Sequence, residues 1–432
     1  MKMMKRLLAL AAALMLCCCC AAAETSEGDV LATVNGTPIP RAAFDNYLSN
    51  LSSYYEYYGY DVTSAENAAY LRYMTLDTLI QLALMDQKLV ELNIALTDAE
   101  LAAAEQEGRD LWSEDVSNAM SYYGVTDAST EAERATVMVQ VLSELEALGY
   151  TEETYVQDAV NNALYIKLEE VMVSGASVTD AQIDAYYAQL VTEDRDAYAD
   201  DAAAFESAQQ MNAIAMMYSM TDYYDALWYI PEGYRNVVHI LLEVDEGLLN
   251  SWYDLQASYE EQQSAAEEGG EVTGEPVTEE EVENARLAVL ASVQAKVSEI
   301  QQKLTEGAAF EELIPQYTAD DTMDSAEEIA KGVQVHMDSI LFPAGYRDAV
   351  FALTAPGEVS EAFAADGGVY IVCYVSDMAG GPLSLTEELR QSLRDELMAE
   401  AESIQYSQTM NSWMAEAEIV YSDEALAIMG AE

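Results

Sequence analysis

Apolar residues recur with helical spacing along most of the first half of the chain. The clearest stretch is LDTLIQLALMDQKLVELNI, residues 76–94, whose apolar positions follow one another at i, i+3, i+4, i+7 and i+8. This spacing puts those side chains on one side of a helix. Weaker patterns of the same kind cover residues 97–114, 128–148 and 151–174.

Shorter elements flank these helices. Val30–Val34 has the composition of a strand, Asn35-Gly36 is a strong signal for a tight turn, and a helix is expected to begin near Arg41. The stretch SVTDAQIDAYYAQL, residues 177–190, predicts another amphipathic helix with Thr179 as its N-cap. The first region, up to about residue 230, is therefore predicted to be mostly helical.

The pattern changes at Pro231. A strand is expected at Val237–Glu243, followed by a helix at residues 248–261. Thr278 and Glu281 form a capping box, which predicts a second helix with its stop at Gly307. A second strand is expected at residues 369–375. This β-α-α-β order predicts a small α+β unit in which the two outer strands are neighbours in one sheet.

These patterns divide the chain into four segments. A leader occupies residues 1–23, a helical domain residues 24–230, the β-α-α-β domain residues 231–380, and a helix with a short strand residues 381–432. An acidic insertion rich in Gly and Glu, at about residues 246–285, interrupts the third segment and is expected to be flexible in part. The predicted fold class is α+β.

The leader has the features of an export signal. Lys2, Lys5 and Arg6 precede an apolar run, Leu7–Leu16, which is too short to span a bilayer. A Leu three residues before a Cys resembles a bacterial lipobox and indicates lipidation at Cys19 or Cys17. The alternative is cleavage after Ala23, within an A-x-A context. The protein is thus expected outside the cytoplasm at a bacterial cell surface, anchored by lipid in the first case and secreted in the second.

Charge narrows the possible partners. The chain of 432 residues carries 78 acidic and 18 basic residues, a formal net charge of -60. Nucleic acid and anionic lipid surfaces need basic residues and are excluded as general partners. The acidity either serves solubility or steers basic, unfolded polypeptides toward the protein. Tyrosines cluster in SYYEYYGY, residues 53–60, as a packing surface or a contact patch for peptides.

Metal and cofactor chemistry has little support in the sequence. The two histidines are far apart, and Cys373 is the one cysteine outside the leader, so no close-spaced ligand set exists. No G-x-S-x-G, P-loop or G-x-G-x-x-G motif is present. We expect no metal and no cofactor, and Cys373 is expected in the core.

Several stretches carry a resemblance to known families. VVHILLEV, EGAAFEELIPQYT, YRDAVFALTAPGEVSEAF and GGVYIVCYV together resemble a parvulin-type peptidyl-prolyl isomerase domain. VLATVNGTPIPRAAFDNYL, MDQKLVELNIALTDAEL and SVTDAQIDAYYAQL resemble the N-terminal chaperone domain of the extracytoplasmic SurA/PrsA family. That family's C-terminal segment packs back on its N-terminal domain, and AEAEIVYSDEA is similar to it. The resemblance implies a mostly helical chaperone domain, completed by the C-terminal helix, with a parvulin-like domain inserted.

The resemblance also implies site residues. His239 matches the first-strand histidine of the family, Asp320 stands where the family has Cys or Asp, and Tyr370 replaces its second histidine. These three are the expected catalytic residues. The expected substrate-binding residues are Phe342, Tyr346 and Gln334, of which Gln334 replaces an apolar residue. The alternative for His239 is a structural core histidine, hydrogen-bonded across the sheet to a residue such as Tyr370.

The implied function is that of an exported folding factor. It would isomerise X-Pro bonds in unfolded or nascent exported polypeptides, without nucleophile, metal or cofactor. Because the second histidine and the Gly-Asp-Leu-Gly turn of the family are replaced, the alternative is a non-catalytic chaperone whose parvulin-like domain only binds peptides. A solute-binding lipoprotein would need alternating βα units, which the pattern does not show.

Overall fold

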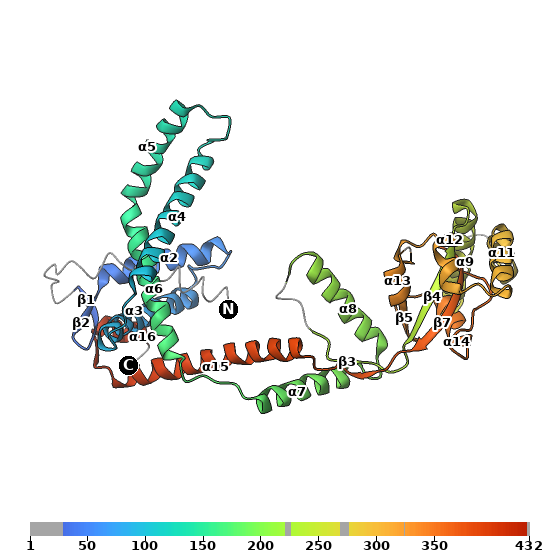
Figure 1. Cartoon of the computed structure of the whole chain (residues 1–432). Coiled ribbons are helices and arrows are strands. Elements are labelled where there is room, and N and C mark those ends of the chain that lie inside the picture. The colour runs from blue at the N-terminus through green and yellow to red at the C-terminus, as the bar shows by residue number, and fades with distance from the viewer. Residues whose placement is uncertain (1–28, 221–225, 268–275, 324, 430–432) are drawn as a thin grey trace. The chain divides into compact units, whose positions relative to one another are not determined.

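The computed structural model of the chain describes residues 29–220, 226–267, 276–323 and 325–429. It consists of two compact units (Figure 1): Met1–Asp180 with Gln391–Glu432, and Ala181–Arg390. The sequence pattern predicts boundaries near residues 230 and 380, whereas these units divide at 180 and 390. The leader, with Cys17, Cys19 and Ala23, lies outside the described residues, as does much of the Gly- and Glu-rich stretch of the insertion.

The first unit is built mainly from five helices. Three of them begin with a Thr capping box, at Thr97, Thr130 and Thr151, where the side chain accepts the N–H that the first helical turn leaves unpaired. The helices confirm the predicted amphipathic stretches. They are α2 (Arg41–Tyr57), α3 (Ala65–Glu91), α4 (Asp98–Tyr122), α5 (Glu131–Ala147) and α6 (Glu152–Met172).

The C-terminal segment completes this unit. Strand β1 (Val30–Val34) pairs with β2 (Thr37–Pro40) through the Asn35-Gly36 turn, and on its other edge with β9 (Ile419–Tyr421). Leu76, Ile80 and Leu84 of α3 are almost fully buried. They share a core with Met410 of α15 (Glu387–Glu416) and Ala425 of α16 (Asp423–Met429). The predicted completion of the helical domain by the chain's C-terminal part is confirmed.

The second unit holds a four-stranded antiparallel sheet of order β5-β4-β7-β6. The two long strands, β4 (Arg235–Leu242) and β7 (Gly368–Asp377), are neighbours, as predicted. The two edge strands are β5 (Val333–Val335) and β6 (Phe363–Ala365). With three residues each, they are too short to show a period-2 pattern in the sequence. A separate pair joins β3 (Tyr229–Ile230) to β8 (Gly381–Pro382).

Helices surround this sheet. The helix predicted from Thr278 to Gly307 is interrupted at Val293, which ends α10 and precedes α11. The helices of the unit are α7 (Asp180–Tyr198), α8 (Ala202–Met217), α9 (Glu246–Glu267), α10 (Glu279–Ser292), α11 (Gln294–Thr305), α12 (Phe310–Tyr317), α13 (Ala326–Lys331) and α14 (Ala344–Ala352), with a 3₁₀ turn η2 (Asp321–Met323). Among the described helices, none is long and apolar enough to cross a membrane.

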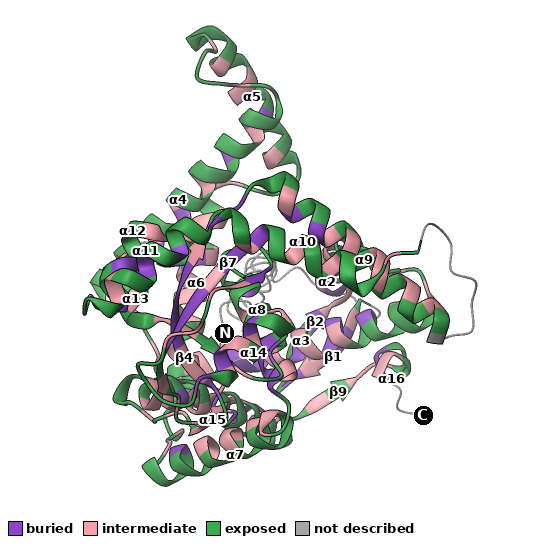
Figure 2. Cartoon of the chain, turned by 90° about the vertical axis from the view of Figure 1, so that its right-hand side faces the viewer, coloured by how far each residue is buried: buried purple, intermediate pink, exposed green. Residues whose placement is uncertain are grey.

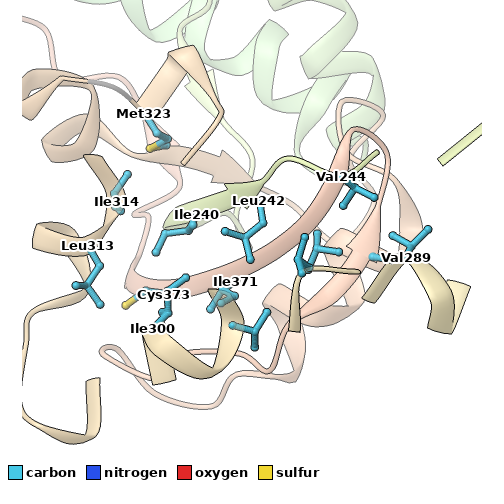
Figure 3. Packing of buried hydrophobic residues seen from close by; sticks show 14 of the residues in the cluster. Ile240, Leu242, Val244, Val289, Ile300, Leu313, Ile314, Met323, Ile371 and Cys373 are labelled. Carbon is cyan, nitrogen blue, oxygen red and sulfur yellow. The ribbon is translucent and has the colours of Figure 1, made fainter. Parts of the chain in front are cut away.

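Both faces of the sheet are covered. Ile240 and Leu242 of β4, with Ile371 and Cys373 of β7, pack against Ile300 and other residues of the helices (Figure 3). The opposite face carries a smaller cluster that includes Val237, Tyr346 and Val372. Figure 2 shows much of β4 and β7 as buried, whereas α5 is largely exposed. Cys373 is a free, buried core cysteine, as expected.

One close helix contact of the first unit can be tested by substitution. A Cβ on Gly108 of α4 would lie 2.5 Å from the Cα of Val156 and 2.7 Å from the carbonyl oxygen of Tyr155 on α6. Both are backbone atoms, so Gly108→Ala forces the helices apart. The resulting strain of about 1–3 kcal/mol exceeds the gain in helix propensity of about 1 kcal/mol. We expect a lower Tm, measured by circular dichroism.

Gly345→Ala is the matched control. Gly345 lies in α14, and a Cβ there would meet no atom within 4 Å. Its Tm should be equal to or slightly above that of the wild type. An unchanged Tm for Gly108→Ala would contradict the close packing of α4 on α6.

Candidate functional site

His239 occupies the middle of β4 on the sheet face of the smaller cluster. Side chains alternate along a strand, so Val238 and Ile240 enter the large core while Val237 and His239 face the other side. The residue as a whole is 3% exposed. A polar ring in this position has to find its hydrogen-bond partners within the protein.

Both ring nitrogens of His239 have such a partner. Nε2 lies 2.6 Å from Oδ2 of Asp320, and Nδ1 lies 2.8 Å from the hydroxyl of Tyr346. A carboxylate only accepts, so Nε2–H donates to Asp320 and Nδ1 accepts from the Tyr346 hydroxyl. Burial lowers the pKa of His239 below its ordinary value, and the Asp320 carboxylate offsets this only in part. The histidine is therefore neutral near pH 7.

Asp320 is held in place by its own chain segment. The N–H of Ala319 donates to the carbonyl of Leu241, and the N–H of Leu241 donates to the hydroxyl of Thr318. Burial alone would raise the pKa of Asp320, but hydrogen bonds from the hydroxyl and N–H of Thr322, and then from His239, lower it. Asp320 is thus an ionised carboxylate. Its side chain is 19% exposed, against 4% for His239.

Two aromatic rings contact the histidine, and two more stack on them. Tyr346 is 2% exposed and stacks on Phe342, with ring centroids 4.9 Å apart and planes at 18°. Tyr370 meets His239 edge to face at 5.3 Å and stacks on Phe363 at 5.9 Å. Since Phe342, Phe363 and Tyr370 are only partly buried, they form the accessible part of this cluster.

Tyr370 does not take the place of a hydrogen-bonding histidine. Its hydroxyl donates to the carbonyl of Asp366 at 2.9 Å, and burial raises its pKa to about 12, so it stays neutral. The suggested bond between His239 and Tyr370 is therefore wrong: Tyr346 provides that hydroxyl instead.

Gln334 lies apart from the other predicted site residues. It is exposed and pairs with Asn236, whose neighbours on that sheet face are Val238 and Ile240. His239 faces the other side, where Val335 of β5 packs in the cluster of Tyr346. The prediction for Gln334 is off by one residue. A shift of one residue along a strand exchanges the two sheet faces, so Val335, and not Gln334, lies on the face of His239. Five of the six predicted residues converge, and Gln334 does not.

Sequence analysis missed Phe363 and Glu206. Phe363 lies within the motif PGEVSEAF, so its aromatic ring was a signal that could have found it. Glu206 of α8 is 1% exposed and accepts hydrogen bonds from the Ser339 hydroxyl, the Ile340 N–H and the Tyr234 hydroxyl at 2.9, 2.7 and 3.2 Å. It fixes the loop that leads into Phe342. No local pattern marks it, because its partners are more than 130 residues away in two cases.

The arrangement suits noncovalent chemistry. It offers an ionised carboxylate, a neutral histidine and apolar ring faces, and the two ring nitrogens of His239 are bound to Asp320 and Tyr346 rather than to a nucleophilic side chain. In the described parts of the chain, no three His, Cys, Asp or Glu side chains are grouped as metal ligands.

Comparisons with known proteins identify the N-terminal part. Residues 3–115 match the family model of the SurA-like N-terminal domain. No curated protein matches the chain. The structure reported for the SurA-like chaperones PEB4 and Cj1289 of Campylobacter jejuni is 13% identical, with 76% of this chain and 96% of that chain covered and a TM-score of 0.27. PrsA of Bacillus subtilis is 14% identical, with 93% and 97% covered and a TM-score of 0.20.

Residues 3–115 of this chain are therefore similar to the SurA-like N-terminal domain.

Proposed function

We propose that this chain is an exported folding factor whose second unit isomerises X-Pro bonds in unfolded polypeptides. The observation that carries the proposal is the hydrogen-bond chain Asp320–His239–Tyr346, bordered by the accessible rings of Phe342, Phe363 and Tyr370. The parvulin-like stretches contain His239, Tyr346, Phe363 and Tyr370, and Asp320 follows one of them by two residues.

The reaction requires no bond to be made. Rotation about the peptide bond is opposed by a barrier of about 18–20 kcal/mol, which arises from amide resonance. A catalyst therefore has to stabilise the twisted amide more than the planar one. The twisted amide has lost its resonance and part of its charge separation, so an apolar surface accommodates it better than water does. In the proposal, the proline ring packs on Phe342, Phe363 and Tyr370.

Asp320 and His239 take different roles. Asp320 is the more exposed of the two and can face the substrate carbonyl. A carboxylate there opposes the negative charge that resonance places on the carbonyl oxygen, and so weakens the double-bond character of the C–N bond. His239 is buried, and its role is to orient Asp320 and Tyr346.

A second candidate is peptide binding without catalysis. It is favoured by the Tyr370 hydroxyl, which is bound to the Asp366 carbonyl, and by the burial of Tyr346. Neither hydroxyl is then presented to a substrate amide. In this case the aromatic rings would hold apolar residues of an unfolded chain and leave the rate of isomerisation unchanged.

Export and anchoring belong to the same proposal. The leader would direct the chain out of the cytoplasm, and a lipid on Cys19 or Cys17 would hold it at the outer face of the membrane. Intact mass of the mature protein tests this: a diacylglyceryl cysteine at its N-terminus supports anchoring, and an N-terminus at Glu24 shows cleavage after Ala23 instead.

Isomerase activity is tested with the full chain and a short X-Pro peptide. We expect acceleration of cis–trans exchange, with kcat/KM reduced at least about tenfold, or about 1.4 kcal/mol, in His239→Ala and in Asp320→Asn. The first variant removes both hydrogen bonds of the ring, and the second keeps the shape of Asp320 without its charge.

Gln334→Ala is the control for this experiment. Because Gln334 is exposed on the opposite sheet face, the kcat/KM of this variant should stay within about twofold of the wild-type value. If the wild type does not accelerate exchange but still suppresses aggregation of an unfolded protein, catalysis is rejected in favour of peptide binding.

The lowered pKa of His239 predicts a pH-dependent stability. In the unfolded chain the imidazole binds a proton as the pH falls below about 6.5, whereas the folded protein keeps it neutral. Stability therefore declines on acidification, with a slope of up to about 1.4 kcal/mol per pH unit from this group. Denaturant unfolding at pH values between about 7 and 5 should show a shallower decline in His239→Gln than in the wild type. Parallel profiles would contradict the neutral, buried histidine.

A further inference from the structure

Five tyrosines form a second aromatic surface, at the end of α2 and in the turn that follows. We name this group, Tyr54, Tyr55, Tyr57, Tyr58 and Tyr60, the tyrosine surface. Adjacent rings contact one another with centroids 4.9–5.8 Å apart. The three outermost rings are largely exposed: Tyr57 at 84%, Tyr58 at 60% and Tyr60 at 61%.

The core of the first unit does not require these rings. Phe44 and Tyr47 are the buried residues of α2. The tyrosine surface adds contiguous aromatic area beyond them, and such exposed patches on soluble proteins mark interaction sites. Since each ring braces its neighbour, little side-chain entropy remains to be lost when a ligand binds.

Charge around the tyrosine surface has one sign. Along the chain between Arg41 and Arg72, the ionisable residues other than tyrosine are Asp45, Glu56, Asp61 and Glu66, all acidic. Glu56 lies between Tyr55 and Tyr57 in the sequence, and Asp61 follows Tyr60. The hydroxyl and N–H of Thr63 donate to Asp61 and lower its pKa, so this carboxylate stays ionised.

No Lys or Arg within residues 29–220, 226–267, 276–323 and 325–429 lies over a ring of the tyrosine surface. Among the described residues, the cation–π contacts involve Trp413, Phe351, Tyr374 and Tyr317, and none involves the tyrosine surface. A ring face attracts a cation, and nearby carboxylates strengthen that attraction. Arginine suits such a surface better than lysine, because its planar guanidinium stacks on aromatic rings.

We propose that the tyrosine surface binds arginine-rich segments of unfolded polypeptides. It is a binding site separate from the aromatic cluster of the second unit. The net charge of -60 attracts such segments from a distance and repels a second copy of the chain. The proposal depends on the proposed folding function in one respect, namely that the bound segment belongs to an unfolded polypeptide. Binding at this surface does not require isomerisation.

The test measures peptide binding by the full chain. The probes are fluorescent Gly-Ser peptides that carry several arginines, the same number of lysines, or the same number of glutamates. Fluorescence anisotropy is recorded at low salt and at about 0.15 M salt, where the Debye length is about 8 Å. We expect binding of the arginine peptide, weaker binding of the lysine peptide, and none of the glutamate peptide.

The key variant is Tyr57→Leu/Tyr58→Leu/Tyr60→Leu. It keeps apolar side chains but removes the ring faces. The affinity for the arginine peptide should fall about tenfold or more at the higher salt. The triple Tyr→Phe variant at the same positions retains the rings and should bind as the wild type does. X-Pro isomerisation should be the same in all of these proteins, so a failure here is distinct from a failure of the proposed function.

Tyr122→Leu/Tyr218→Leu is the matched control. Both tyrosines are exposed, at 87% and 68%, and lie outside the tyrosine surface. This variant should bind the arginine peptide normally. Equal binding by the triple Leu variant and the wild type would overturn the proposal and leave diffuse electrostatic attraction as the explanation. Concentration-dependent self-association that the triple Leu variant abolishes would assign the surface to a second copy, and would also overturn it.

Discussion

Strand β4 is buried on both faces, and this constraint determines the site of the second unit. Val238, Ile240 and Leu242 fill the helix-covered face, so each residue between them is directed to the opposite side. A histidine on such a strand is stable only if both nitrogens find partners, because an unpaired buried polar group costs about 1–3 kcal/mol. Asp320 and Tyr346 satisfy that requirement. Their hydrogen bonds to His239 hold the loop of Asp320 and helix α14 against the same sheet face.

The same requirement recurs at Glu206. A buried carboxylate needs donors on both oxygens, and Tyr234, Ser339 and the backbone of Ile340 provide them. The result is a fixed loop from Ser339 to Phe342, with Phe342 stacked on Tyr346. Two buried polar groups on different elements thus determine where the accessible aromatic rings lie. The proposed chemistry depends on them although neither offers much surface to a substrate.

The acidity of the chain affects solubility and encounter with partners more than it affects the fold. Most carboxylates are on exposed helix faces, where water solvates them and where they affect encounter and solubility more than the fold. Exceptions are the carboxylates with assigned partners, such as Asp320 and Glu206. The tyrosine surface combines acidic neighbours in the sequence with exposed aromatic rings, over which no Lys or Arg of the described residues lies.

The sequence by itself determined the elements that depend on neighbouring residues. The spacing of Leu76, Ile80 and Leu84 specifies the stripe of α3, and the Thr-x-x-Glu boxes mark helix starts, because these signals lie within a few residues. It also indicated that β4 and β7 are adjacent. Only the tertiary structure decided the partners of His239. Asp320 is 81 and Tyr346 is 107 residues away. Helix α14 supplies Tyr346, rather than Tyr370 of β7, as the hydroxyl partner of His239. The sheet register puts Val335, rather than Gln334, on the sheet face of His239. A hydrogen bond between distant segments follows from how the whole unit packs, and a register shift of one residue reverses which side chains face the site.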